Sequence, residues 1–351
     1  MPANFFRHIA IAFTVAAAAA LSGCQSTGTG DVLDLEGAAN VEATEVTPEI
    51  AGEGETRIAL AIPLSGGQAA AGKEIRQGAE LALGDLGAGK ISLAFYDTAG
   101  SAAFAPQGAV PVAFVTNETP RPAGTFAFLP SAADSLAYGV RTALAAKPGE
   151  VVLFVPDSVP NAEAEALETR LSQMATTHAV RYGTARTSAQ IAQRARKQLE
   201  KATVIAFAGN ETKIAQIVKA LTVPGQDKPA IVGNMDWNST LISSESLDGA
   251  LVPQPDSGSF DVVAGRYSKA YGASPTPSAL LAYDFVAVAA GIVRARGAKG
   301  LTRVTLTGNA GFRGATGAFR FRPDGRVERL YAVHVIDDGQ LKPLQDAAEG
   351  F

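Results

Sequence analysis

Residues 58–74, IALAIPLSGGQAAAGKE, contain two strings that are associated with nucleotide binding. Residues 64–68 spell LSGGQ, the signature string of ABC transporter ATPases, and residues 67–73 spell the G-x-x-x-x-G-K of a P-loop. A P-loop continues with Ser or Thr, whose hydroxyl binds Mg²⁺, but here Glu74 follows, and its carboxylate would repel phosphates. The sequence therefore argues against ATP hydrolysis. We expect a strand, a glycine loop and a helix that serve another purpose.

Other catalytic groups are scarce. Beyond residue 8 the chain has two histidines, His178 at a predicted helix end and His334 in an alternating strand, and neither lies near a nucleophile motif. There is no G-x-S-x-G or H-E-x-x-H string. The single cysteine, Cys24, cannot form an internal disulfide or a cysteine-rich metal site. We expect no enzymatic activity, no cofactor and no metal site.

The N-terminus is typical of an exported protein. Arg7 precedes an apolar run of 13 residues, 9–21, which is shorter than the roughly 20 residues of a spanning helix but suits a signal peptide. Leu21-Ser22-Gly23-Cys24 resembles the lipobox of bacterial lipoproteins. It predicts removal of residues 1–23 and lipidation of Cys24. The alternative is that Cys24 is a leftover thiol of a cleaved leader.

Residues 25–56 have the composition of a tether. They contain eight acidic residues and no Lys, Arg or aromatic residue, so they cannot bury enough apolar surface to fold. We expect residues 24–56 to be a lipidated cysteine and a disordered spacer on the periplasmic face of the cell envelope. Gln25 resembles the pattern for outer-membrane sorting. The whole chain has a net charge of −4 and no basic stripe, so nucleic-acid binding is not expected.

The rest of the chain alternates between short apolar runs and helical patterns of 10–16 residues, which predicts parallel sheets with helices on both faces. About 290 residues in 57–345 exceed what one core usually serves, so we expect two Rossmann-like lobes of an α/β protein. A closing hairpin is predicted from 317–322, a turn at 323–325, and 326–336. The predicted strands are 57–64, 91–97, 110–116, 125–129, 151–155, 179–182, 203–208 and 229–234, and the predicted helices are 68–83, 132–146, 162–177, 189–201, 213–221, 259–271 and 277–296.

Several short motifs resemble the type I periplasmic binding proteins of the leucine/isoleucine/valine-binding group. They are residues 58–66 with Gly72 and 78–82 (GAELA), then 95–98 (FYDT), 282–284 (AYD) and 314–324 (GATGAFRFRPD) before Gly325. The tether and the Ala-rich helices also resemble the penicillin-binding-protein activator lipoproteins. The resemblance implies two lobes, lobe 1 at about 57–124 and 250–312 and lobe 2 at about 125–249 and 313–345.

The chain departs from that family in two places. Only residues 99–109 separate the predicted strands 91–97 and 110–116, and a parallel crossover usually needs a dozen residues or more with a helix. One βα unit of the first lobe is therefore expected to be missing, with the serine loop that grips the ligand in the family. Ser158-Val159-Pro160 also replaces the family's Tyr-Gly, a usual ligand-facing position.

Ligands of doubly wound sheets bind outside the carboxyl ends of the strands. The candidate cleft residues at these ends are Ser65, Gly66, Gln68, Thr116, Asn117, Asn210, Asp236 and Trp237. Trp237, the only tryptophan, has a second interpretation as a helix-start residue packed on the sheet. Tyr283-Asp284 is expected to be core packing with a capping contact.

Three functions stay open at this point. The resemblance favours a lipoprotein that regulates cell-wall synthesis, like a penicillin-binding-protein activator, with a peptidoglycan synthase as partner. The alternative is a substrate-binding lipoprotein that delivers an amino acid of the leucine, isoleucine or valine type to an ABC permease. A hydrolase without a visible motif is the third. In the first two the membrane is contacted through the lipid on Cys24.

Overall fold

The computed structural model describes residues 47–87, 89–99, 110–221, 228–256 and 260–351. Within them the chain forms a five-stranded, a seven-stranded and a three-stranded sheet with flanking helices. The predicted α/β class with two lobes and mainly parallel sheets is confirmed. The predictions for the signal peptide, Cys24 and residues 25–46 lie outside the described residues.

The first lobe is built on the five-stranded sheet, in the order β1-β3-β2-β4-β5. Strands β3, β2, β4 and β5 are parallel, and β1 is antiparallel to β3. The two long strands read TRIALAI and ISLAFYD and are buried on both faces, as expected of a parallel sheet. The bounds are β1 Glu49–Ala51, β2 Thr56–Ile62, β3 Ile91–Asp97, β4 Val112–Ala113 and β5 Phe126–Ala127.

Strand β1 corrects the predicted tether, which ended at residue 56. Glu49 pairs with Phe95 and Ala51 with Leu93 along the edge of the sheet, and Arg76 of the first helix donates to Glu49. An edge strand has one open side, so it tolerates charged and exposed residues that a central strand would not. The folded body therefore begins at least seven residues earlier than the composition predicted.

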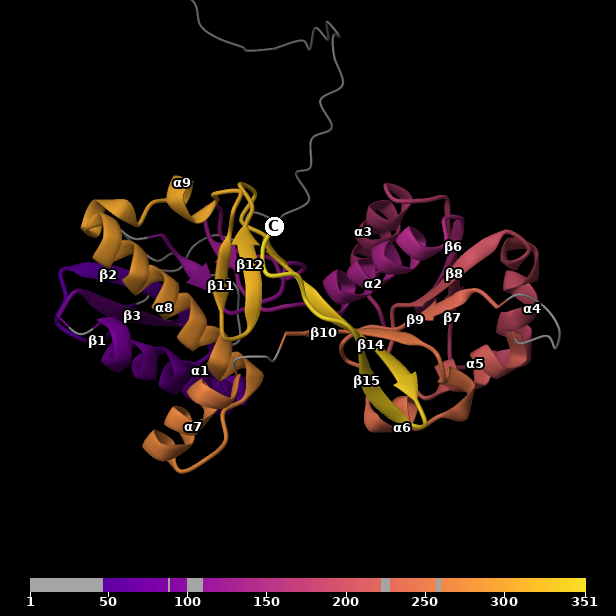
Figure 1. Ribbon diagram of the computed structural model, residues 1–351, viewed down its shortest axis with the longest axis horizontal. Helices are drawn as coiled ribbons and strands as arrows, with labels where there is room; N and C mark the ends of the chain where they lie inside the picture. The colour runs from indigo at the N-terminus through magenta and orange to yellow at the C-terminus, as the bar shows by residue number, and fades with distance from the viewer. Residues whose placement is uncertain (1–46, 88, 100–109, 222–227, 257–259) are drawn as a thin grey trace, which may run out of the picture. The chain divides into compact units, whose positions relative to one another are not determined.

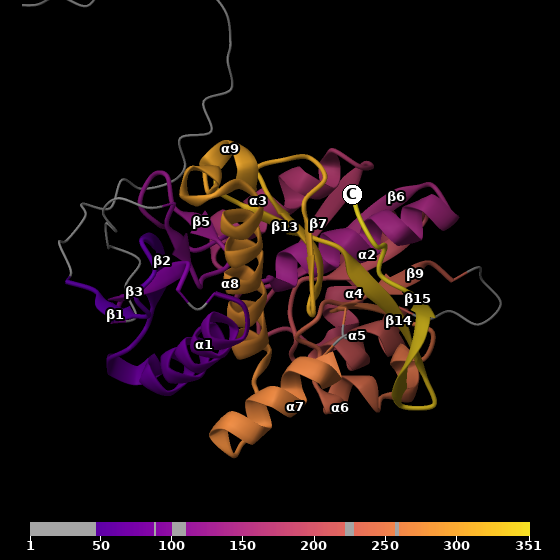
Figure 2. The same cartoon turned by 60° about the vertical axis from the view of Figure 1, so that its left-hand side comes forward.

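Helices α1 (Ala69–Ala82) and α8 (Pro277–Arg296) lie side by side on one face of this sheet (Figures 1 and 2). Glycines allow the close approach. A Cβ on Gly72 would lie 1.9 Å from the carbonyl oxygen of Pro63, and one on Gly78 would lie 1.9 Å from that of Ala279. Helix α8 has the length and hydropathy of a membrane span, but 67% of it is buried in the protein, so it is a core helix.

The opposite face of the first sheet is covered differently. Its buried cluster consists of small strand residues such as Ala59, Ala61 and Ala94 with Tyr96, and no described helix contributes to it. The predicted loss of a βα unit concerns 99–109, of which 100–109 lie outside the described residues. The next parallel crossover, from β4 to β5 through 114–125, contains turns and no helix.

The second lobe is built on the seven-stranded sheet, in the order β15-β14-β10-β9-β8-β6-β7. Alternate residues of its central strands face two separate cores. Val152 and Phe154 pack with helices α4, α5 and α6, whereas Val151 and Leu153 pack with α2 and α3. The strands are β6 Glu150–Pro156, β7 Thr177–Tyr182, β8 Ala202–Phe207, β9 Ala230–Val232, β10 Leu251–Pro255, β14 Tyr331–Asp337 and β15 Gln340–Gln345, and the helices are α2 Ala132–Ala146, α3 Asn161–Ser172, α4 Ser188–Leu199, α5 Lys213–Leu221 and α6 Ser239–Ile242.

The three-stranded sheet corrects the predicted closing hairpin. Strand β12 (Gly317–Phe321) pairs with β11 (Phe312–Gly314) and β13 (Val327–Arg329), and the predicted turn at 323–325 joins β12 to β13. The predicted strand 326–336 is interrupted at Leu330, and its second half is β14 of the other sheet. One apolar run therefore serves two lobes.

Aromatic packing also moves the predicted lobe boundaries. Phe128 contacts the rings of Phe285, Phe319 and Phe321, which places the three-stranded sheet in the core of the first lobe. Strand β5 belongs to the first sheet and β10 to the second. The chain therefore changes lobes near residues 130, 256–260 and 330, rather than near 124, 249 and 312 as predicted. Helices α7 (Phe260–Tyr271) and α9 (Arg303–Leu306) complete the first lobe.

Candidate functional site

Each lobe has a point where the order of its parallel strands reverses. In the first sheet it lies between β2 and β4, and in the second between β6 and β8. Ligands of such sheets bind outside the carboxyl ends of the strands at these points. Ser65, Gly66, Gln68, Thr116 and Asn117 follow β2 and β4, while Asn210 follows β8 and Asp236 and Trp237 follow β9. Position along the chain is therefore right for all eight candidates, and side-chain contacts decide among them.

The loop after β2 rests on Asp97, at the end of the neighbouring strand. The Oδ1 atom of Asp97 accepts hydrogen bonds from the backbone N–H groups of Leu64 at 2.8 Å, Ser65 at 3.1 Å and Ala99 at 2.8 Å. Burial opposes ionisation, but a hydrogen bond from the Ser65 side chain together with these backbone bonds outweighs it, and the pKa of Asp97 lies below its ordinary value. The loop is fixed from below by an ionised carboxylate.

The residues of this loop are otherwise exposed to solvent. Ser65, Gly66, Gly67 and Gln68 are all exposed, and Gly66 has a φ of 74°, which suits glycine. A Cβ on Gly67 would meet no atom within 4 Å. The Ser65 hydroxyl bonds to Asp97, whereas the Gln68 side chain is exposed. Ser65, Gly66 and Gln68 remain candidate ligand-binding residues.

Asn117, after β4, has a different role from the one predicted. Its Nδ2 donates to Asp134 Oδ2 at 2.7 Å and to the carbonyl of Val327 at 2.8 Å, and its Oδ1 accepts from the N–H of Val327 at 2.9 Å. The side chain ties β13 to the start of α2 and has no free N–H for a ligand. Thr116 contacts the hydroxyl of Thr119 at 3.2 Å.

Trp237 is also corrected as a cleft residue. It is 4% exposed, its Nε1 donates to the carbonyl of Gly209 at 3.1 Å, and its ring packs on Gly233 and near Phe207. The second interpretation, packing on the sheet, is confirmed. Neighbouring Asn234 is buried and its amide contacts the carbonyls of 207, 208 and 209, the shortest at 2.9 Å. These two residues fix the loop after β8 rather than face a ligand.

The loops at the carboxyl ends of the strands in the second sheet carry negative charge. Asp157, Ser158, Asn210 and Asp236 are exposed after β6, β8 and β9. In the part of the chain that the structure describes, neither the Asp157 nor the Asp236 carboxylate has a hydrogen bond or ion pair, and partial burial raises the pKa of Asp236. Glu211 is different, because it accepts a short hydrogen bond from the buried Tyr182 hydroxyl.

Asp157 was not among the predicted site residues. Its signal is present in the sequence, because it follows the apolar run 151–155 after a single proline, at the carboxyl end of a predicted strand. The nearest lysine does not neutralise this edge. Lys213 donates to the carbonyls of Thr184 at 3.0 Å and Arg186 at 2.8 Å, so its ammonium group is engaged on the β7 side. Two exposed carboxylates therefore dominate the loops after β6 and β9.

Three other singled-out residues lie away from these edges. His178 pairs with Glu150 at 2.9 Å across β7 and β6, and His334 lies within β14. Asp284 is 1% exposed and accepts hydrogen bonds from the N–H groups of Ala315 and Thr316, both at 2.7 Å. The predicted structural role of Asp284 is confirmed.

Solved structures with the same architecture identify the fold. A branched-chain amino acid ABC transporter protein from Rhodospirillum rubrum has a TM-score of 0.61 at 15% identity, over 82% of this chain and 99% of that one. A periplasmic ligand-binding protein of a branched-chain amino acid ABC transporter from Burkholderia xenovorans LB400 has a TM-score of 0.59 at 17% identity, over 85% and 95%. The fold is that of the type I periplasmic binding proteins.

Proteins of this fold have also been solved with other ligands. A solute-binding protein of an ABC transporter from R. palustris, in complex with benzoate, has a TM-score of 0.51 at 15% identity, over 85% of this chain and 98% of that one. No protein-family model and no curated protein matches the sequence. The sequence resemblance to this fold is confirmed.

Proposed function

We propose that the protein is a non-enzymatic solute-binding protein of the periplasm that delivers a small solute with a positively charged group to an ABC permease. The observation that carries the proposal is the pair of unpaired carboxylates, Asp157 and Asp236, at the strand ends of the second lobe. An ammonium group on the solute would supply the missing partner. The exposed loop at Ser65–Gln68 offers neutral polar groups for the rest of the solute. An amino acid or a related amine fits this description.

The N-terminal sequence supports a location in the cell envelope. The proposal includes removal of residues 1–23, a lipid on Cys24 and attachment to the outer membrane, with the tether holding the body in the periplasm. Replacing Cys24 with Ser and growing cells with labelled palmitate tests the anchor. Label that stays on the variant would contradict it.

The ligand proposal is tested by thermal shift and calorimetry with leucine, isoleucine, valine, simple amines and benzoate. A matching solute at 100 times its Kd stabilises the folded protein by about 2.7 kcal/mol, which raises the melting temperature by several degrees. Asp236→Asn should weaken binding about tenfold or more, because a charge-assisted hydrogen bond contributes roughly 1.5–3 kcal/mol. Asp261→Asn, on the exposed side of α7, is the matched control. Equal affinity in both variants would refute the site.

The charge of Asp236 should also make the affinity for a cationic solute depend on pH. Only its ionised form attracts a cation, and burial raises its pKa above the ordinary value. Affinity for an amine should therefore be full at neutral pH and fall as the pH drops through this raised pKa. Calorimetry at several pH values measures the fall, and Asp236→Asn should remove this part of it.

A second proposal starts from polar side chains whose hydrogen bonds are already made within the protein. Asn117 of the first lobe and Trp237 of the second are held by structural hydrogen bonds, so neither offers a contact to a ligand, and the β4–β5 connection has no helix. These features weigh against tight solute capture, and we propose as a second candidate a regulator of cell-wall synthesis, like a penicillin-binding-protein activator, that binds a peptidoglycan synthase. Biolayer interferometry with the synthase's periplasmic part tests it. Nanomolar to micromolar binding, with no melting shift from 1 mM branched-chain amino acids, would favour the regulator over the solute carrier.

A further inference from the structure

The segment around α4 carries only basic charges. Between Gln173 and Leu199 there is no acidic residue, while the protein as a whole has a net charge of −4. The basic residues of this segment are Arg181, Arg186, Arg194, Arg196 and Lys197. Such a concentration of one charge attracts anions to this surface.

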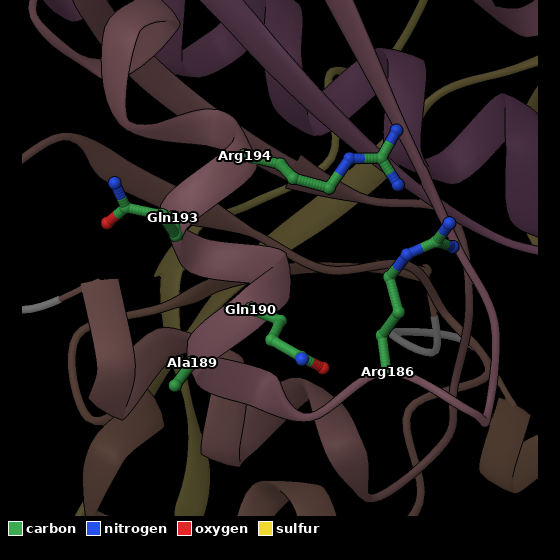
Figure 3. Close-up of a pocket in the computed structure, with 5 residues that line it drawn as sticks. All are labelled: Arg186, Ala189, Gln190, Gln193 and Arg194. Atoms are coloured by element: carbon green, nitrogen blue, oxygen red, sulfur yellow. The ribbon is translucent and has the colours of Figure 1, made fainter.

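Two of these arginines line a pocket of about 440 Å³. Its other lining residues are Ala189, Gln190 and Gln193, so no carboxylate contributes to it. Figure 3 shows the side chains of Arg186, from the loop before α4, and Arg194, from the helix, extending to the same side with their guanidinium groups toward one another. Two cations that line one pocket attract an anion to it.

Neither guanidinium is satisfied by the protein. In the described part of the chain Arg186 has no side-chain hydrogen bond or ion pair, and Arg194 makes one long bond, 3.4 Å, to the carbonyl of Arg181. Elsewhere the arginines find partners, as Arg170 does with Asp134 and Arg76 with Glu80. Each guanidinium has five N–H donors, so most donors at this pocket are available to a ligand.

The backbone beneath Arg186 is fixed in place. Lys213 Nζ donates to the carbonyls of Thr184 and Arg186, at 3.0 and 2.8 Å. On the other side, the Thr187 hydroxyl accepts from the N–H of Gln190 at 3.3 Å, and the Gln190 side chain accepts from the N–H of Thr187 at 2.9 Å. A fixed backbone lowers the entropy lost when a ligand is bound.

We propose that this pocket binds a phosphate group. Two planar forks on different elements can each contact one edge of a tetrahedral oxyanion, whereas a planar carboxylate is already satisfied by one fork. The pocket lies beside β7, the edge strand of the sheet, and Asp157 and Asp236 do not line it. The site is therefore separate from the proposed solute site and does not depend on it. The phosphate belongs either to a free ion or to the headgroup of an anionic phospholipid.

The test follows ³¹P line broadening of inorganic phosphate with the full-length protein. The double variant Arg186→Ala/Arg194→Ala should weaken phosphate binding about tenfold or more, because it removes two sets of charge-assisted hydrogen bonds. Arg196→Ala is the matched control, since Arg196 is exposed on the same helix and does not line the pocket. Its affinity should be unchanged.

A second arm distinguishes the two sources of phosphate. Sedimentation with phosphatidylglycerol vesicles, compared with phosphatidylcholine vesicles, measures headgroup binding by the same three proteins. Vesicle binding that is lost in the double variant assigns the site to a lipid headgroup, and binding of free phosphate alone assigns it to the ion. The proposal is overturned if Arg196→Ala weakens binding as much as the double variant, or if neither phosphate nor vesicles bind the wild-type protein. The arginines are exposed, so circular dichroism should show an unchanged fold.

Discussion

Replacing Asp284 with Ala should destabilise the first lobe strongly. The carboxylate projects from the buried side of α8 and holds the turn between β11 and β12, accepting from the N–H groups of Ala315 and Thr316 at 2.7 Å each and from the Thr316 hydroxyl at 2.5 Å. A Cβ on Gly314 would lie 2.3 Å from the Asp284 carboxyl carbon, so the backbone lies directly against it.

The magnitude follows from the groups left behind. Alanine leaves two backbone N–H groups and one hydroxyl without an acceptor, at roughly 1–3 kcal/mol each. It also removes a negative charge near Arg329, which is fully buried and whose pKa burial lowers to about 10. Part of this cost is offset, because burial of the carboxylate is itself unfavourable and raises the pKa of Asp284. The net loss should be about 3–5 kcal/mol.

Urea unfolding measures this loss, with Asp261→Ala on α7 as the control for removal of an exposed carboxylate. Asp284→Asn should fall between wild type and Asp284→Ala. It keeps one acceptor oxygen, but its NH₂ group faces a donor. A loss below about 1 kcal/mol in Asp284→Ala would refute the account, because it would mean that the turn is held without the carboxylate.

The glycines, the tryptophan and the first loop offer further tests. Gly72→Ala or Gly78→Ala should cost about 1–3 kcal/mol by urea unfolding, because each new methyl meets a backbone oxygen at 1.9 Å, whereas Gly67→Ala should be neutral. Trp237 should show blue-shifted fluorescence that acrylamide quenches only after unfolding, and early quenching would contradict its burial. The pKa of Asp97 is lowered on folding, so its ionised form stabilises the protein above about pH 4 and this stabilisation is lost below it. Melting curves of Asp97→Asn should therefore depend less on pH in the acid range, and an unchanged profile would contradict this.

The sequence predicts the buried elements well and the edges poorly. The helix predicted at 68–83 is α1, Ala69–Ala82, because its apolar positions repeat with the period of a helix and face a sheet. Strand β1 was missed because three acidic residues, Glu49, Glu53 and Glu55, give that region the composition of a disordered segment. Strand β1 is held by main-chain pairing along the open edge of the sheet, which leaves little hydrophobic pattern in the sequence.

Strand β10 shows another limit of sequence patterns. Its sequence, LVPQP, contains two prolines, which normally argue against a central strand. The strand pairs with β9 only at Leu251, and from Val252 onward its ladder is with β14 alone. Pro253 and Pro255 therefore lie where one side of the strand has no partner strand in the ladder. Only the pairing of distant segments could reveal this.

The candidate site shows why position is easier to predict than orientation. All eight predicted residues follow strands at the carboxyl edge, since that edge is fixed by the alternation of strands and helices. Trp237 and Asn117 nevertheless bind the protein itself, because each has a buried carbonyl within reach. A polar side chain beside unpaired backbone groups is bound by them unless it projects into solvent. Exposure, and not residue type, separates Asp236 from Trp237.

Glycine packing explains the nucleotide-like string in residues 58–74. Gly66 and Gly67 form an exposed loop whose backbone adopts a positive φ at Gly66, and Gly72 is needed because α1 passes against the carbonyl of Pro63. Any parallel strand that returns through a tight loop into a closely packed helix places glycines at these points. The packing of Gly72 on Pro63 therefore accounts for the second glycine of the G-x-x-x-x-G-K spacing without any phosphate contact. What the unit leaves exposed is the loop at Ser65–Gln68, which Asp97 holds through the N–H groups of Leu64 and Ser65.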